Sequence, residues 1–262
     1  MRTETVNGVL AKPGMAVELK GVHKRYLSDS GTEVDALTEV DFTVKKGEFV
    51  TMIGATGCGK TTLLNIIAGL ETVESGEVRL AADLRLGQTI AYVFQHYTLF
   101  PWRSVLDNVT FGLRMHGVGR RARNKKAREL LSQVGLSEFE NSYPHELSGG
   151  MRQRAAIAQT LALQPKLLLM DEPFGAVDDS TRRDLQRMLT DLWQQNKTTI
   201  LFVTHNVDEA LLMGDRVLVF RERPGKILGE FEIDLPRPRN RVNIAFTELF
   251  IKVRQTLSVD LD

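Results

Sequence analysis

The most constraining feature of the sequence is a glycine-rich loop between an apolar strand and a helix. Residues 54–61 read Gly-Ala-Thr-Gly-Cys-Gly-Lys-Thr and fit the phosphate-loop pattern GxxxxGK[ST]. Residues 49–53 are apolar except for Thr51, which predicts a buried strand. Residues 61–69 have helical spacing of Leu and Ile and stop at Gly69. A strand that runs through such a loop into a helix predicts an α/β fold.

The loop has a direct physical interpretation as a phosphate site. Gly54, Gly57 and Gly59 allow positive φ angles, so that the backbone amides turn inward at the start of a helix and form a nest for phosphate oxygens. Lys60 would reach the β- and γ-phosphates, and the Thr61 hydroxyl would bind Mg²⁺. The predicted nucleotide-binding residues of the loop are Gly54, Ala55, Thr56, Gly57, Cys58, Gly59, Lys60, Thr61 and Thr62.

Two further strand ends carry polar side chains. Leu167–Met170 is an apolar strand followed by Asp171 and Glu172, at the edge of the sheet where open α/β proteins bind ligands. Asp171 would hold Mg²⁺, directly or through water, and Glu172 would polarise the attacking water. Gln95 ends the strand at 90–94 and could touch Mg²⁺ or water.

The remaining pattern predicts an α/β core interrupted by helices. Strands are expected at 17–20, 41–45, 199–203 and 216–220, and helices at 107–115, 121–134, 150–163 and 181–195. We predict a flexible tail at 1–14, a main domain at 15–235 and a C-terminal helical extension at 236–262. The main domain divides into a core, 15–95 and 161–235, and a helical subdomain at about 96–160. In the extension, an apolar stripe favours a docked helix over a ligand site; its members are Val242, Phe246, Leu249, Phe250, Val253 and Leu257.

Composition limits the partners of the chain. Its 34 basic and 33 acidic residues leave a net charge of +1, which provides no long-range attraction to nucleic acid. A single cysteine excludes an internal disulfide framework and suits a reducing compartment. The sequence has no apolar run of the length that a membrane span needs and no secretory signal pattern at its start. We therefore expect a cytosolic chain whose membrane role, if any, needs a partner.

A third motif decides the kind of nucleotide protein. Ser148, Gly149 and Gly150 precede a helix, where they could be a simple helix cap or a second phosphate cradle. Phosphate loop, Leu-Ser-Gly-Gly and Asp-Glu, in this order, resemble the ATP-binding cassette (ABC) ATPases. The resemblance implies a P-loop (RecA-like) core with an N-terminal antiparallel β subdomain and an inserted helical subdomain.

The resemblance also implies roles for particular residues. Ser148, Gly149 and Gly150 would contact the ATP held by a second subunit, so that a homodimer binds two ATP·Mg²⁺ at its interface. His205, after the strand at 199–203, would join Glu172 in catalysis. Asp178 would connect the two sites across the interface. Tyr26 would stack on adenine.

The chain is most similar in motif to importer ATPases of the nitrate, sulfonate, taurine and bicarbonate group. The segments that carry this similarity are 100–109, 147–154, 171–176, 223–225 and 235–239. The departures from the usual pattern are Thr56 for serine, Met151 for glutamine, Val177 for leucine and Gln159 for arginine, and none removes a catalytic group. The group implies permease subunits in the membrane, a separate solute-binding protein, and a peripheral position on the cytoplasmic face of the inner membrane.

The segment His96–Trp102 is unusually aromatic for a loop and is the expected docking site of the permease. The alternative is that Phe100 and Trp102 pack the helical subdomain, and both interpretations stay open. Two other functions are considered. Repair and translation ABC ATPases carry coiled-coil insertions or two cassettes, which this sequence lacks. A purely regulatory ATP switch would be expected to lack Glu172 or His205.

Overall fold

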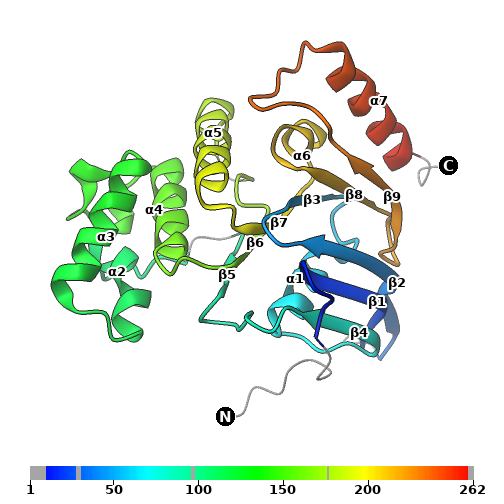
Figure 1. Cartoon of the computed structure of the whole chain (residues 1–262), viewed down its shortest axis with the longest axis horizontal. Coiled ribbons are helices and arrows are strands. Elements are labelled where there is room, and N and C mark those ends of the chain that lie inside the picture. Colours follow the sequence, from blue (N-terminus) through cyan, green and yellow to red (C-terminus); the bar gives the residue numbers. More distant parts are fainter. Residues whose placement is uncertain (1–9, 28–30, 96–97, 176, 259–262) are drawn as a thin grey trace.

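A six-stranded sheet forms the centre of the molecule, in the order β5-β6-β7-β3-β8-β9 (Figure 1). We describe the protein from a computed structural model, in which residues 10–27, 31–95, 98–175 and 177–258 are described. The first five strands in this order run parallel, and β9 is antiparallel to β8. The strands are β3 Phe49–Ile53, β5 Ile90–Val93, β6 Leu167–Asp171, β7 Thr199–Thr204, β8 Arg216–Phe220 and β9 Ile227–Glu232. Every residue of β3, β6, β7 and β8 is buried, which explains their predominantly apolar sequences.

A second sheet, in the order β2-β1-β4, is antiparallel and confirms the expected β subdomain. Its strands are β1 Met15–Leu27, β2 Glu33–Lys45 and β4 Ser75–Leu80. The prediction of a strand at 41–45 was too short, because β2 begins at Glu33. Register shifts interrupt the β1–β2 pairing at several points, and such bulges break the period-two pattern that sequence analysis depends on.

Helix α1, Lys60–Ala68, lies between the two sheets, and six of its nine residues are buried. It fills one hydrophobic core with side chains from both sheets, including Leu64 of the helix, Val17 of β1 and Leu169 of β6. Because α1 begins directly after the glycine-rich loop, this packing fixes the loop against the end of the central sheet.

Three helices at one end of the molecule share a separate core (Figure 1). They are α2 Val105–Met115, α3 Arg120–Gln133 and α4 Gly149–Leu161, with short 3₁₀ turns at Ser137–Phe139 and Pro144–Glu146. The helices predicted in this region are confirmed, and the division into domains at residues 96 and 160 stays a prediction.

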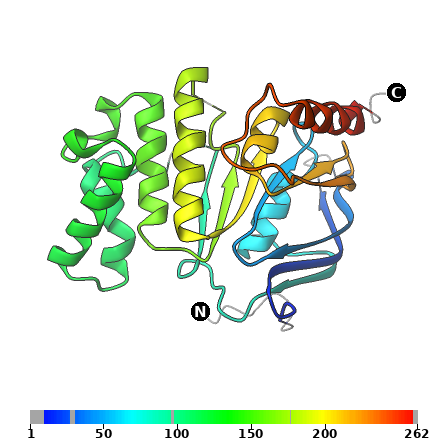
Figure 2. The same ribbon diagram turned by 45° about the horizontal axis from the view of Figure 1, so that its top comes forward.

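The other face of the sheet is covered by α5 Asp179–Asn196 and α6 Val207–Met213, and α7 Ile244–Ser258 packs over α6, β8 and β9 (Figure 2). Phe246 and Val253 of α7 are buried there, so the apolar stripe is a docked helix, except for Val242, which precedes the helix and is exposed. At the other end of the chain, Leu10 and Ala11 pair with Leu80, so the described part of the predicted tail is attached to the sheet. No helix within the described ranges is long and apolar enough to cross a membrane.

Candidate nucleotide-binding site

The glycine-rich loop follows the buried strand β3 and ends at α1, as predicted. Gly57 and Gly59 have φ angles of 81° and 90°, in the left-handed region that side chains disfavour. A Cβ atom on Gly59 would also lie 2.5 Å from the backbone oxygen of Ala36, so the position has no space for a side chain. The prediction of a positive φ angle is wrong for Gly54, where a Cβ atom would instead lie 2.9 Å from Sγ of Cys58 and from the backbone oxygen of Phe220. The loop thus needs glycine for conformation at some positions and for close packing at others.

Lys60 is folded back over the loop. Its side chain is buried, and its Nζ atom donates to the backbone oxygens of Gly54 and Ala55, each at 2.8 Å, and lies 3.2 Å from Sγ of Cys58. These contacts hold a cation at the first turn of α1, where the amino end of the helix also favours anions. The loop therefore has the charge and shape of a phosphate site.

Asp171, the last residue of β6, is buried next to the first turn of α1. Burial raises the pKa of its carboxyl group above the ordinary value, and a hydrogen bond with the Thr61 hydroxyl acts against this rise. The charge of Glu172 raises the pKa further, and that of Lys60 lowers it. A cation placed between Thr61 and Asp171 would relieve the cost of burying this carboxylate.

Glu172 and His205 follow the neighbouring strands β6 and β7, and their side chains meet. Nδ1 of His205 lies 3.2 Å from Oε2 of Glu172. The backbone N–H of Glu172 donates to the backbone oxygen of Val203 at 3.0 Å, and its φ angle of 42° is left-handed, which turns the chain away from the strand. The histidine is largely exposed and the glutamate is mostly buried, so the pair borders solvent at the carboxyl edge of the sheet.

A cavity of about 470 Å³ brings together nine of the predicted residues, namely Tyr26, Thr56, Gly57, Gly59, Lys60, Thr61, Thr62, Gln95 and Glu172. Its lining does not include the predicted residues Gly54, Ala55, Cys58, Asp171 and His205. Tyr26 comes from the far end of β1, where Lys24 lies 5.1 Å above its ring and its hydroxyl is 3.5 Å from Glu71. One concave site of this size, with backbone amides at one part and an aromatic ring at another, suits a nucleotide.

Sequence analysis missed four residues that also line this cavity, namely Leu27, Val34, Ala36 and Arg223. Val34 pairs with Tyr26 across β1 and β2, so a prediction of β2 at its full length would have placed Val34 beside Tyr26. Arg223 lies in the turn between β8 and β9, more than 160 residues from the loop in sequence. It belongs to the segment 223–225 that carries the family resemblance, but the resemblance assigned it no role in the site.

The Leu-Ser-Gly-Gly motif stands apart from this cavity, whose lining includes none of its residues. Ser148 caps α4, with its Oγ accepting a hydrogen bond from the backbone N–H of Met151 at 3.3 Å. A Cβ atom on Gly150 would lie 2.3 Å from Cγ2 of Thr181, so glycine allows α4 to approach α5 closely. Within one chain Ser148 is therefore a helix cap; the serine is exposed, and Gly149 and Gly150 are partly exposed.

Asp178 caps α5 in the same way. Its Oδ1 accepts hydrogen bonds from the backbone N–H groups of Ser180 and Thr181 at 3.1 and 3.0 Å, and from the Ser180 hydroxyl at 2.6 Å. The hydrogen bonds from Ser180 and then Thr181 hold the pKa of this exposed carboxyl well below its usual range. Asp178 does not line the nucleotide cavity. It is hydrogen-bonded to Thr181, whose side chain lies against Gly150 of the Leu-Ser-Gly-Gly motif.

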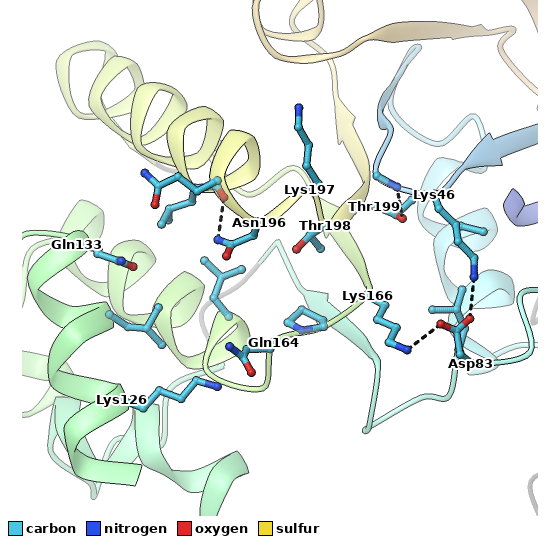
Figure 3. Close-up of a pocket in the computed structure, with 18 of the residues that line it drawn as sticks. Lys46, Asp83, Lys126, Gln133, Gln164, Lys166, Asn196, Lys197, Thr198 and Thr199 are labelled. Atoms are coloured by element: carbon cyan, nitrogen blue, oxygen red, sulfur yellow. Dashed lines mark hydrogen bonds and ion pairs between the residues drawn. The ribbon is translucent and has the colours of Figure 1, made fainter. Parts of the chain in front are cut away.

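A second cavity, of about 540 Å³, lies elsewhere (Figure 3). It is lined by residues at the amino ends of β6 and β7, such as Lys166 and Thr199, and therefore opens at the opposite edge of the sheet from Glu172. Asp83 accepts hydrogen bonds there from Lys166 at 2.8 Å and Lys46 at 3.2 Å. Because the carboxylate is shared by two lysines within the protein, and no glycine-rich loop borders the cavity, we assign the nucleotide to the smaller site.

The aromatic segment after Gln95 is divided between packing and exposure. The ring of Phe100 packs on Phe111 of α2, with centroids 4.7 Å apart, and Arg103 lies over both rings. Trp102 is 71% exposed. Phe100 thus packs against α2, whereas the Trp102 ring, whose centroid is 5.6 Å from that of Phe100, is mostly exposed. His96 and Tyr97 lie outside the described residues.

Comparison with known families agrees with this geometry. The family model described as ABC transporter matches residues 37–175, more than half of the chain. The taurine import ATP-binding protein of Rhizobium johnstonii is 47% identical over 79% of this chain and 80% of its own length. The nitrate import ATP-binding protein of Synechocystis is 44% identical over 87% of each chain. An ABC transporter ATP-binding protein of Methanocaldococcus jannaschii is 49% identical over 87% of this chain and 86% of its own.

Solved structures show the same fold. A dimeric bacterial ABC transporter cassette superposes with a TM-score of 0.73 at 33% identity, covering 84% of this chain and all of that one. The same cassette has also been solved as a dimer in a post-hydrolysis state bound to ADP and phosphate. The family match, the identity over most of the chain and the shared fold show that this chain belongs to the ABC transporter family, as an ATP-binding subunit.

Proposed function

We propose that two copies of this chain bind and hydrolyse ATP and thereby energise the import of a small anion through membrane permease subunits. The observation that carries this proposal is that the expected ATP-binding motifs lie in two separate places on one chain. One cavity contains the phosphate loop and Glu172, while the capped motif at Ser148 stands outside it. A second chain placed head to tail could bring its own motif over the phosphates, and the related cassette is a dimer.

In this mechanism each residue acts on bound ATP. The amides of residues 54–59 and Lys60 would hold the phosphates, and Tyr26 would stack on the base. Glu172 would orient and polarise the attacking water, with His205 holding the glutamate and facing the γ-phosphate. Ser148, Gly149 and Gly150 of the second copy would complete the phosphate site. Asp178 would connect the two nucleotide sites across the dimer interface.

The residues of the site fit Mg²⁺. Thr61 and Asp171 place a hydroxyl and a buried carboxylate together, and Gln95, whose side chain carries an amide oxygen, lines the cavity with Thr61. Such a small set of oxygen ligands suits Mg²⁺, which usually keeps several waters and shares substrate phosphates. Bound there, the ion would neutralise charge on the phosphates.

The transport role is supported by the relatives. Curated relatives at 41–47% identity are named as import ATP-binding proteins for taurine, aliphatic sulfonates and nitrate and as a transport ATP-binding protein for bicarbonate. All four solutes are small and carry an anionic group, so we propose a small anion as cargo. The partners would be permease subunits that contact Trp102 and a separate solute-binding protein. The chain would lie on the cytoplasmic face of the membrane.

ATP can drive transport only if it favours one conformation of the dimer over the other. ATP bound between two copies stabilises the closed dimer only if it binds that state more tightly than the open one. Closure would pull the permeases toward the outward-facing state, and hydrolysis at Glu172 would reset them.

The test compares two helix-cap variants by ATP hydrolysis at increasing protein concentration. Ser148→Arg would block the composite site, and Ser104→Arg is the matched control, since Ser104 caps α2 with the same bond at 3.2 Å to the backbone N–H of Asp107. We expect wild-type activity per molecule to rise with concentration, Ser104→Arg to follow it, and Ser148→Arg to bind ATP without turnover. Activity per molecule that is independent of concentration, with an active Ser148→Arg, would contradict the two-chain site. ATP binding without any turnover in the wild type would instead indicate a regulatory switch.

A further inference from the structure

The turn between β8 and β9, residues 221–226, is built against the phosphate loop. The backbone N–H of Gly225 donates to the backbone oxygen of Ala36 at 3.0 Å, and the backbone N–H of Thr38 donates to that of Gly225 at 2.9 Å. A Cβ atom on Gly225 would lie 2.1 Å from the backbone oxygen of Cys58. The turn is therefore held between β2 on one side and the backbone of the loop on the other.

This placement brings Arg223 to the mouth of the nucleotide cavity. Its Nε atom donates to the backbone oxygen of Gly57 at 3.0 Å, and its Nη2 atom lies 3.1 Å from where a Cβ of Gly57 would be. The side chain is exposed and lines the same cavity as Lys60 and Glu172. The bond to Gly57 uses Nε, and within the described part of the chain Nη1 and Nη2 make no hydrogen bond or ion pair.

The charges that line the cavity favour an anionic ligand at Nη1 and Nη2 of Arg223. Arg223 and Lys60 are the two cationic side chains in the lining, and Glu172 is its one carboxylate. The Nζ atom of Lys60 is already bonded to two backbone oxygens of the loop. A guanidinium anchored through one nitrogen keeps its fork of donors in a fixed direction, and such a fork matches phosphate oxygens better than an ammonium does.

We propose that Arg223 is a phosphate-binding residue of the nucleotide site, with its terminal nitrogens donating to phosphate oxygens of bound ATP. This inference rests on the proposed function, because it takes ATP as the ligand. Arg223 then has two roles in one side chain: Nε holds Gly57, and the terminal nitrogens reach the nucleotide. It also connects the phosphates to β8 and β9, the strands on which α7 packs.

A purely structural role makes a different prediction. If Arg223 only braces the loop through Gly57, its loss should weaken nucleotide binding by an amount that does not depend on salt. A direct contact between guanidinium and phosphate is partly exposed to solvent, so its contribution should decrease as ionic strength rises. The salt dependence of the loss therefore separates the two roles.

The experiment measures the dissociation constant for ATP at low and high NaCl, for wild type, Arg223→Gln, Arg223→Lys and Lys226→Gln. Lys226 is the matched control, a cation in the same turn whose Nζ pairs with Glu39 at 2.8 Å and which does not line the cavity. We expect Arg223→Gln to weaken ATP binding by about tenfold to a hundredfold at low salt, as for a lost charge-assisted hydrogen bond. The loss should shrink at high salt, Arg223→Lys should be intermediate, and Lys226→Gln should match the wild type.

Three outcomes would overturn the inference: wild-type affinity in Arg223→Gln, a loss that is the same at both salt concentrations, or an equal loss in Lys226→Gln. Each of these requires a wild type that binds ATP. A wild type that fails to bind ATP would instead contradict the proposed function, so the two failures are distinguishable. The melting temperature of each nucleotide-free variant shows whether the fold is retained.

Discussion

Nδ1 of His205 lies 3.2 Å from Oε2 of Glu172, although the two residues are 33 positions apart. They meet because β6 and β7 are parallel neighbours, so that the residues following each strand emerge at the same edge of the sheet. The contact orients the glutamate, which lines the cavity together with residues of the phosphate loop.

Glu172→Gln is expected to keep ATP binding and to lower turnover by roughly 10² to 10⁴, the usual contribution of a general base. The amide keeps the size of the side chain and removes the charge that polarises water. Turnover is measured by phosphate release and dimer formation by size-exclusion chromatography with ATP, where the variant should be trapped as a dimer. Near-normal turnover would refute the catalytic assignment.

His205→Ala should lower turnover much less in the Glu172→Gln background than in the wild type. The reason is that the effects of residues that act as a unit are not additive. The comparison uses turnover of the two single variants and the double variant. Strictly additive losses would show that His205 acts independently of Glu172.

Trp102→Ala should leave the ATPase activity of the isolated protein unchanged, since the indole is 71% exposed and lines no part of the nucleotide cavity. With the permease present, the variant should lose stimulation and transport. Phe100→Ala is the contrasting change: Phe100 packs on Phe111, so its loss should lower the free energy of unfolding by about 2 kcal/mol. Unchanged transport in Trp102→Ala would argue against docking at this residue.

Gly225→Ala should destabilise the protein by about 1–3 kcal/mol and weaken ATP binding, because the methyl group would push the turn away from Cys58 and the phosphate loop. Gly119→Ala is the control, at an exposed position with no atom within 4 Å of the added Cβ. Urea unfolding and ATP titration of both variants test this expectation, and equal behaviour of the two would contradict the close contact.

Asp83→Asn should lower stability near neutral pH by less than about 1 kcal/mol, because the side chain is 38% exposed and water screens its ion pairs. The hydrogen bond from Lys166, with a smaller one from Lys46, lowers the pKa of Asp83 from 3.8 to about 2. A folded-state pKa below the unfolded one means that this stability is present above about pH 3.8 and is lost as the pH falls toward 2. The difference between wild type and variant in urea unfolding should therefore shrink over this range.

Glu138→Gln is the control for that measurement. Glu138 is exposed, and no ion pair within the described ranges involves it, so its loss should leave stability unchanged at either end of the pH range. A difference between wild type and Asp83→Asn that persists near pH 2 would show that the carboxylate charge is not the cause.

Local patterns predicted the elements that carry the nucleotide site. The buried strands β3, β6 and β7 are continuous apolar runs, and the phosphate loop and Asp171-Glu172 follow them directly. By contrast, β4, α6 and β9 were not predicted. They are short, and only two residues separate α6 from β7, so neither length nor period distinguishes α6 from its surroundings.

The sequence by itself determined the loop, the strand-end carboxylates and the family, because each depends on residues adjacent in the chain. Only the tertiary structure decided which distant residues share the site. Arg223 reaches Gly57 because β8 lies next to β3, and Ser148 stays outside the cavity because α4 belongs to a separate core. Strand order and helix packing are properties of the whole chain, set by which apolar faces bury one another, and no local pattern encodes them.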